Sequence, residues 1–199
     1  MMPRPLLKLL RWVRSLDRTH KGPTIDIVSK DHIDAARSLS ITRDNKIWDR
    51  SQVYDYRFSH PDIVDFWRSF HKQLERRNIP VRAFEFTRSP ERQEQLFNQG
   101  RSKARSGQSP HQIHTFRFET HKMVSGQKIK QVYFQDYSAA VDVIHALRGW
   151  ELTKKEWDVI GIIGKEVARK RKIEIEWGGD WHFYDPAHWQ LKKWKQLLQ

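Results

Sequence analysis

The chain has 199 residues, of which 38% are apolar, and a formal net charge of +13 at pH 7. This length suits one domain, and nine tryptophans and ten phenylalanines supply bulky side chains for its core. The lack of cysteine excludes disulfides and thiolate chemistry, so any metal must be bound by His, Asp or Glu. The positive charge predicts attraction to a polyanion such as nucleic acid, anionic lipid or an acidic wall polymer.

Residues 1–50 form a basic N-terminal region that we expect to pack as an arm on the rest of the chain. Within it, residues 5–16 place apolar residues on one side of a helix and basic residues on the opposite side, which predicts a short amphipathic helix. Such a helix either docks on the domain or lies on a membrane surface, and its shortness favours docking. Residues 24–28 are a possible strand. Basic residues interrupt every apolar run, so we expect no secretory signal, and no stretch is apolar enough to span a membrane.

Residues 51–199 are expected to form a single domain that opens with a helix and a strand. Residues 61–78 carry an aromatic stripe at helical spacing, and residues 79–87 alternate as a strand. Ser89 and Pro90 then provide an N-cap and a first helical residue, for a helix that runs to about Asn98 and stops at Gly100.

The middle of the chain predicts an inserted β-hairpin at about residues 112–137. Phe116 and Phe118 alternate on one side of it, Val132 and Phe134 alternate on the other, and Ser125-Gly126 supplies the turn. A basic loop precedes this hairpin, and a short strand over residues 138–144 follows it.

The C-terminal third predicts a long helix over residues 153–171 that begins with a Thr153/Glu156 capping box. Gly161 and Gly164 on its apolar face indicate close approach to a sheet. A strand over residues 172–177 and a closing helix over 191–198 complete the chain. The order of elements predicts an α+β fold, with a small antiparallel sheet, helices packed on one side and the functional site on the open face.

Residues 176–190 contain an unusual concentration of candidate functional side chains, with three Trp, two His and two Asp. Asp185 and His188 lie at a turn-to-strand junction there and, with His111 and Asp142 upstream, supply candidate ligands for zinc. Two imidazoles and a carboxylate leave a position for water, whose pKa the metal lowers toward about 7. Asp185 could take the proton of that water. The spacing leaves other trios open, because the chain has ten His.

In this order the motifs resemble the zinc peptidases of bacterial cell-wall peptides. These are the VanY- and VanX-type D-alanyl-D-alanine carboxypeptidases and dipeptidases, and the phage endolysins that cleave L-alanyl-D-glutamate bonds. The resemblance covers roughly residues 79–190. It is carried by Arg88-Ser89, Gln93, Gly107-Gln108-Ser109-Pro110-His111, Ala140-Val141-Asp142, Trp177-Gly178-Gly179-Asp180-Trp181 and Asp185-Pro186-Ala187-His188.

The resemblance implies a zinc site of His111, Asp142 and His188, with Asp185 as general base. It also implies that Arg88 meets a substrate carboxylate or the oxyanion and that Ser109 helps to hold the peptide. Asp180 and His182 compete with Asp185 for the base role and rank lower. One departure is that residues 112–137 separate His111 from Asp142, which the family places a turn apart. Either the hairpin returns them to one place, or His114 or His121 replaces His111.

The resemblance therefore implies a monomeric peptidase, most like a phage endolysin, that cuts L-Ala-D-Glu or D-Ala-D-Ala bonds in peptidoglycan stem peptides. We expect cytoplasmic synthesis, action on the cell wall and attraction to anionic envelope polymers. The hairpin is either a lid that clamps acidic wall peptide or a neutral insertion. Two alternatives stay open: a basic nucleic-acid-binding protein or nuclease, although no specific nucleic-acid motif is present, and an inactive relative that only binds wall peptide.

Overall fold

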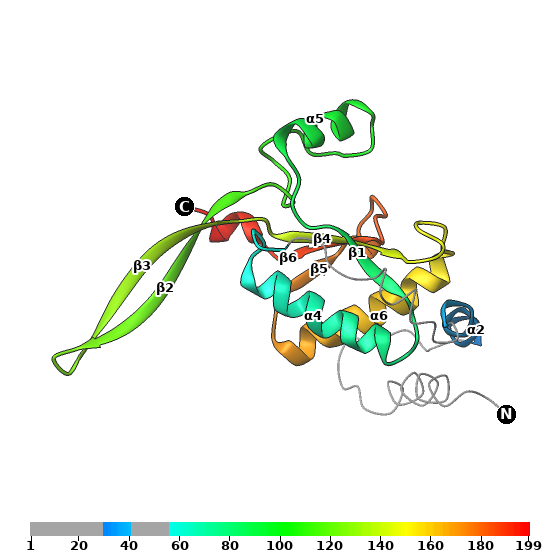
Figure 1. Ribbon diagram of the computed structural model, residues 1–199, viewed down its shortest axis with the longest axis horizontal. Helices are drawn as coiled ribbons and strands as arrows, with labels where there is room; N and C mark the ends of the chain where they lie inside the picture. The colour runs from blue at the N-terminus through cyan, green and yellow to red at the C-terminus, as the bar shows by residue number, and fades with distance from the viewer. Residues whose placement is uncertain (1–29, 41–55) are drawn as a thin grey trace.

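The computed structural model describes residues 30–40 and 56–199 of the chain (Figure 1). In this part the fold is α+β, as predicted, and its centre is a four-stranded sheet with strand order β1-β4-β6-β5. Every neighbouring pair in that sheet is antiparallel. The strands are β1 (Val81–Glu85), β4 (Ala140–His145), β6 (His188–Leu191) and β5 (Ile175–Trp177).

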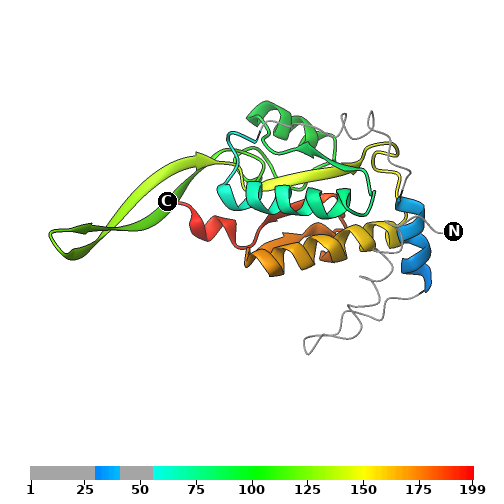
Figure 2. The ribbon, with the colours of Figure 1, turned by 60° about the horizontal axis from the view of Figure 1, so that its bottom comes forward.

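Two helices, α4 (Pro61–Glu75) and α6 (Lys154–Arg171), lie side by side across one face of the sheet (Figure 2). The aromatic stripe of α4 is buried against Trp189 of β6, with ring centroids 5.2 Å from Phe66 and 5.1 Å from Phe70. Successive strand residues point to opposite faces. Because Trp189 points toward the helices, its neighbour His188 points toward the other face.

The close approach predicted for α6 is present where it crosses β5 and β6. A Cβ atom on Gly161 would collide with the ring of Trp177, and one on Gly164 would collide with the ring of Trp189. The helix begins at the predicted capping box, in which the Thr153 hydroxyl accepts from the Glu156 backbone and the Glu156 carboxylate accepts from Thr153. The two glycines therefore let the helix lie directly on two indole rings.

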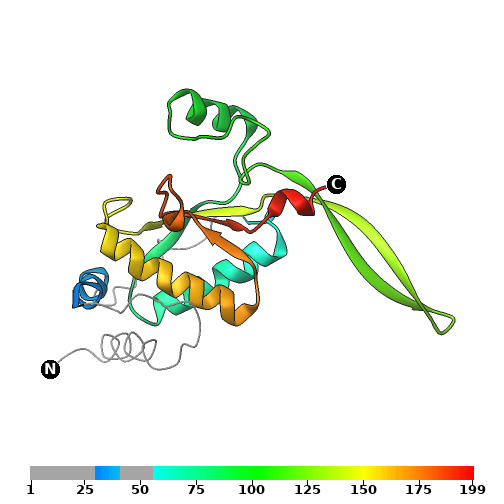
Figure 3. The ribbon, with the colours of Figure 1, turned by 180° about the vertical axis from the view of Figure 1, so that it is seen from behind.

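The helix α5 (Pro90–Asn98) lies on the opposite side of the sheet from α4 and α6 (Figures 1 and 3). Ser89 caps it and Pro90 is its first residue, as predicted. The helices α4 and α6 thus cover one face, while α5 and its following loop form a wall beside the open face.

The predicted hairpin is formed by β2 (His114–Val124) and β3 (Gln127–Tyr137), which pair along their whole length. Ser125 and Gly126 both have positive φ, 50° and 80°, as a two-residue type I′ turn requires. The hairpin projects from the body of the protein (Figures 1, 2 and 3). Only its base joins the core, where Phe116 is fully buried.

Some elements differ from the prediction. The helix α2 (Lys30–Leu39) was not predicted, and the closing helix is a short 3-10 turn, η2 (Trp194–Leu197), with strand β6 before it. Residues 178–180 form another 3-10 turn, η1 (Gly178–Asp180). The predicted helix at 5–16, the strand at 24–28 and the boundary near residue 50 lie outside the described residues. Within the described ranges, no helix has the length and apolar character needed to cross a membrane.

Candidate metal centre

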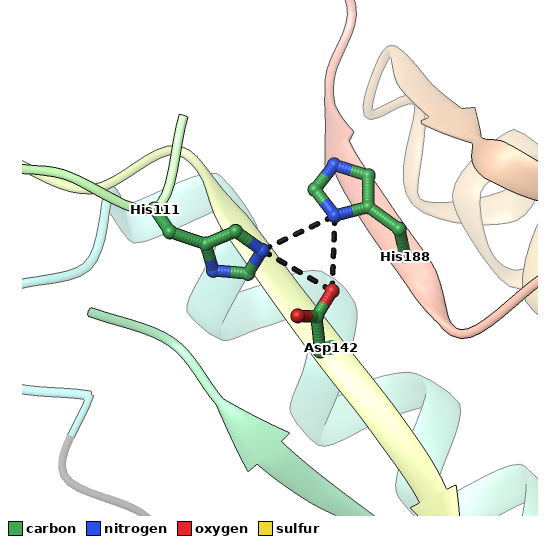
Figure 4. A group of neighbouring side chains, drawn as sticks. All are labelled: His111, Asp142 and His188. Carbon is green, nitrogen blue, oxygen red and sulfur yellow. Dashed lines mark hydrogen bonds and ion pairs between the residues drawn. The ribbon is translucent and has the colours of Figure 1, made fainter. Parts of the chain in front are cut away.

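Three side chains from separate parts of the chain meet on the open face of the sheet (Figure 4). His111 comes from the loop before β2, Asp142 from β4 and His188 from β6. Oδ1 of Asp142 is 3.1 Å from Nε2 of His111 and 2.9 Å from Nδ1 of His188, and the two ring nitrogens are 3.1 Å apart. All three potential ligand atoms lie within 4.8 Å of one another, so the group could hold a metal ion.

The strand pairing explains how two of these residues meet. Asp142 and His188 are direct partners in the antiparallel β4–β6 pair, and directly opposite residues point to the same face. The third residue, His111, is held by backbone hydrogen bonds from Arg88 N to His111 O, 2.8 Å, and from Ala139 N to Pro110 O, 2.6 Å. The ends of the hairpin insertion are thereby closed together, and His111 reaches Asp142 although residues 112–137 separate them.

The hydrogen bonds of the two histidines orient their lone pairs toward each other. Nδ1 of His111 lies 3.1 Å from the Phe86 carbonyl oxygen, which can only accept, so Nδ1 carries the proton and Nε2 presents a lone pair. Nε2 of His188 lies 3.0 Å from Oε1 of Gln190, whose amide donates over 3.0 Å to Glu176. Donation from Nε2 leaves the lone pair of His188 on Nδ1. Both rings thus have the outer hydrogen-bond partner that is typical of metal-bound histidine.

These tautomers make three acceptors converge: two imidazole lone pairs and one carboxylate oxygen. Such a group is repulsive unless a cation lies among its members. Burial by itself would raise the pKa of Asp142, but the charge and hydrogen bonds of His111 and His188 hold it well below its usual range. Burial lowers the pKa of His188, and the hydrogen bond and charge of Asp142 outweigh this effect and raise it. The site therefore favours a positive charge, which a proton or a divalent metal can supply.

Arg88 contacts the candidate metal centre through the carboxylate oxygen of Asp142 that does not face the histidines. Its side chain is only 9% exposed. It donates to Glu85 over 2.8 Å from Nε, to Gln93 over 2.8 Å from Nη1 and to Oδ2 of Asp142 over 3.1 Å from Nη2. Gln93 is fully buried and donates hydrogen bonds to the Ser102 hydroxyl and the Ala104 carbonyl, so it holds the loop after α5 in place. The observed contacts of Arg88 therefore orient Asp142, and its contact with substrate stays a prediction.

Ser109 is also buried, and its hydroxyl accepts a hydrogen bond from the backbone N–H of His111 over 3.3 Å. Its carbonyl oxygen accepts from Nε2 of His114 over 2.8 Å. The structure thus gives Ser109 a role in shaping the loop of His111. The same contact directs His114 away from Asp142, and His121 lies far along the hairpin, opposite Lys130. His111 is therefore the histidine that the fold brings to Asp142 and His188.

Asp185 faces the same cavity from the loop between η1 and β6. The loop is fastened by Gly178, whose carbonyl accepts from the backbone of Asp185 over 3.0 Å and whose missing Cβ leaves room for the Asp185 carbonyl. Burial, together with the negative charge of Asp142, raises the pKa of the Asp185 carboxyl. The competing Asp180 instead forms an ion pair with Lys165, 2.9 Å, and His182 is exposed. Neither of them lines the cavity.

The cavity has a volume of about 400 Å³. Its walls combine the candidate metal ligands and Asp185 with cationic and aromatic side chains, among them Arg92, Arg101, Lys103, Trp150, Trp181 and Phe183. The ring centroid of Trp181 lies 5.2 Å from that of His188, and the ammonium of Lys103 lies 5.0 Å above the ring of Phe183. No residue of the hairpin lines this cavity, so the structure does not place the hairpin over the site as a lid.

Two supporting groups were missed by sequence reasoning: the Phe86 carbonyl and Gln190. A backbone carbonyl leaves no signal in a sequence. The supporting role of Gln190 becomes recognisable only once the pairing of β5 with β6 is known, because that register places Gln190 opposite Glu176.

Comparison of the sequence with protein-family models and with curated proteins finds no match. Among solved structures, the chain is similar to the L-Ala D-Glu endopeptidase ChiX of Serratia marcescens. The TM-score is 0.48 and the sequence identity is 23%, over 71% of this chain and 86% of that one.

Proposed function

We propose that this protein is a zinc-dependent peptidase that hydrolyses amide bonds in peptidoglycan stem peptides. The observation that carries the proposal is the convergence of three acceptors, from His111, Asp142 and His188, beside a desolvated carboxylate. This donor set fits a catalytic metal, because two imidazoles and one carboxylate leave part of the coordination shell for solvent or substrate. When bound, the metal supplies a Lewis acid that polarises a carbonyl and acidifies a coordinated water.

Asp185 is the proton carrier in this proposal. It lines the cavity and has no ion-pair partner within the described residues. A carboxylate that is partly removed from water has a higher proton affinity than a solvated one, as the raised pKa reflects. Asp185 accepts a proton from the attacking water and delivers it to the amine that leaves. Gln190 and the Phe86 carbonyl hold the imidazoles of His188 and His111 in the tautomers whose lone pairs point to the proposed metal position.

The substrate class follows from the walls of the cavity and from the sequence motifs. Arg92, Arg101 and Lys103 form a cationic side, which suits a peptide that carries several carboxylates, and wall stem peptides are of this kind. The motif order around Arg88, His111, Asp142 and His188 resembles that of the cell-wall peptidases. Whether the bond is L-Ala-D-Glu or D-Ala-D-Ala, and whether the protein acts as an endolysin, are finer parts of the same proposal.

The test is digestion of purified peptidoglycan followed by mass spectrometry of the soluble muropeptides. We expect zinc-dependent release of new amino groups, and the fragment masses identify the bond that is cut. Asp185→Asn, which retains the metal ligands, is the control for contaminating hydrolases. If the wild-type protein with bound zinc releases no fragments and instead shifts DNA in a salt-dependent and zinc-independent manner, the nucleic-acid alternative replaces this proposal.

A further inference from the structure

The end of the hairpin has an unusual surface composition. This hairpin tip, residues 121–130, contains Lys122, Lys128 and Lys130 and no acidic residue. It also exposes three apolar side chains, Met123 at 64%, Val124 at 43% and Ile129 at 44%. Exposed apolar residues that lie among positive charges are typical of segments that dock on anionic lipid surfaces.

Both faces of the ribbon share this composition. Directly opposite residues of an antiparallel pair point to the same face, and faces alternate along each strand. Lys122 is opposite Ile129, and Val124 is opposite Gln127, so one face carries a lysine and two apolar residues. The other face carries Met123 opposite Lys128 and His121 opposite Lys130. Each side of the tip therefore presents at least one lysine together with at least one exposed apolar side chain.

The two-sided pattern favours a bilayer over a protein partner. A protein interface covers one face of a ribbon and leaves the other in water, whereas the surface of a bilayer surrounds an inserted tip from all sides. Lys130 is paired with Glu119 over 2.7 Å. Within residues 30–40 and 56–199, Lys122 and Lys128 form no ion pair, so their charges are available to lipid phosphates.

The geometry of the hairpin limits how deeply it inserts. The distance along each strand from the Lys122–Ile129 pair to the Val124–Gln127 pair at the turn is roughly 7 Å. This length matches the depth of about 5–10 Å to which interfacial segments enter a membrane. The outer strand edges carry unpaired backbone groups, which must stay hydrated in the headgroup layer. The arrangement therefore suits shallow insertion and excludes a membrane span.

We propose that the hairpin tip docks this protein on anionic membrane surfaces by inserting Met123, Val124 and Ile129 between lipid headgroups, with Lys122 and Lys128 on the lipid phosphates. Strands of eleven residues extend roughly 35 Å, and no hairpin residue lines the cavity. Docking thus leaves the cavity accessible and does not depend on the peptidase activity proposed above.

The experiment uses the full chain and vesicles of phosphatidylglycerol and phosphatidylcholine, with pure phosphatidylcholine vesicles for comparison. The chain has no cysteine, so Val124→Cys gives a single site for an environment-sensitive NBD label. On anionic vesicles we expect a blue shift and a rise in emission at position 124, with no change for the label at Glu151→Cys, an exposed position on the body. This probe reports the tip even if residues 1–29 also bind lipid.

Matched variants test the two components separately. Lys122→Ala with Lys128→Ala should weaken vesicle partition roughly thirtyfold. Lys155→Ala with Lys192→Ala removes the same charge from exposed positions on the body and should have little effect. Replacement of Met123, Val124 and Ile129 by serine should also reduce partition, and circular dichroism checks that each variant is folded.

Two results would overturn the proposal. One is an unchanged NBD spectrum at position 124 while the protein co-sediments with anionic vesicles. The other is full vesicle partition by the serine variant, which would show that the lysines attract any polyanion and that the apolar residues insert nowhere.

Discussion

Arg88 donates a hydrogen bond to Oδ2 of Asp142, while Oδ1 of the same carboxylate faces the imidazoles of His111 and His188. The two oxygens therefore have different partners, and the arginine holds the carboxylate in the orientation that offers a single oxygen to a metal. An outer partner of this kind orients a ligand without touching the metal itself.

The first prediction separates this orienting role from a substrate contact. Arg88→Met removes a buried cation from Glu85, Gln93 and Asp142, and should lower the free energy of unfolding by about 3 kcal/mol in urea titrations. Arg92→Met is the matched control for stability, because Arg92 is 42% exposed and the carboxylate oxygen it approaches, on Glu85, is 3.8 Å away. An Arg88→Met protein of wild-type stability with a raised KM would instead place Arg88 on the substrate.

The second prediction concerns metal content. About one equivalent of zinc should co-purify, and His188→Ala should abolish it, since this change removes one of three ligands. A metal present at 100 times its Kd stabilises the folded state by about 2.7 kcal/mol, so a chelator should lower the Tm measurably. Elemental analysis and thermal unfolding check this. Full peptidase activity in excess chelator, with no zinc detected, would contradict the assignment of these ligands.

The third prediction assigns the base. Asp185→Asn should retain zinc and lose about 10²- to 10⁴-fold in kcat, because an amide cannot accept the proton of water. Asp180→Asn is the control, because its carboxylate is paired with Lys165 outside the cavity and its loss should cost little activity. If the Asp180 variant is inactive and the Asp185 variant is active, the base has been assigned to the wrong carboxylate.

The fourth prediction follows from Glu156, whose carboxylate joins the start of α6 to Arg148 and to Ser38 of α2. Burial raises its pKa, but the hydrogen bonds from Arg148, Ser38 and Thr153 are stronger together and lower it to about 2. A folded-state pKa below the unfolded value of 4.5 gives stability that is complete above about pH 4.5 and is lost as the pH falls toward 2.

The size of this effect is about 3 kcal/mol, from 1.36 kcal/mol for each pKa unit. Urea unfolding of the wild type at pH 7 and pH 3 should show part of this loss, and Glu156→Gln should show a smaller difference between the two pH values. Glu151→Gln changes an exposed residue nearby and serves as the control. An equal pH dependence in the wild type and in Glu156→Gln would show that other groups cause it.

Sequence reasoning succeeded where the determinants are local. The aromatic stripe of α4, the caps of α5 and α6 and the Ser125-Gly126 turn all depend on residues within a few positions of one another. It failed for α2, whose buried apolar residues are mainly two alanines and one leucine, too small a stripe to stand out from its polar positions. Strand β6 was anticipated only as the strand after the Asp185 turn, and its extent was not given, because four residues of mixed polarity become a defined strand only through their pairing with β4 and β5.

The same distinction holds for the candidate site. The three ligands and Asp185 were named from motif order, and the structure brings their side chains to one cavity. The position of Arg88 behind Asp142 and the contact of Gln190 with His188 required the tertiary structure, because each partner is set by strand register. The lid hypothesis for the hairpin rested on the closeness of its base to the metal ligands. The direction in which the two-stranded ribbon leaves the body places its tip away from the cavity. This direction cannot be predicted from the position of the base alone.

The last prediction tests the hairpin against the proposed peptidase. Residues 121–130 can be replaced by Asn-Gly, which connects the opposite residues Thr120 and Gln131. In the native hairpin the two-residue turn connects Val124 and Gln127, which are direct cross-strand partners. The new turn also connects direct partners, so the register of the remaining strands is kept. Phe116 and the stacked pair of Phe118 and Tyr133 stay at the base.

This shortened protein should remain folded and bind zinc, because no hairpin residue lines the cavity or supplies a candidate ligand. Its kcat and KM on a small soluble stem peptide should equal those of the wild type, while its binding to anionic vesicles should be weakened. Steady-state kinetics and vesicle co-sedimentation on the same preparation check both outcomes. A rise in KM for the soluble peptide would mean that the hairpin closes over the cavity in solution and acts as a lid, and loss of zinc would mean that His121 had been wrongly excluded as a ligand.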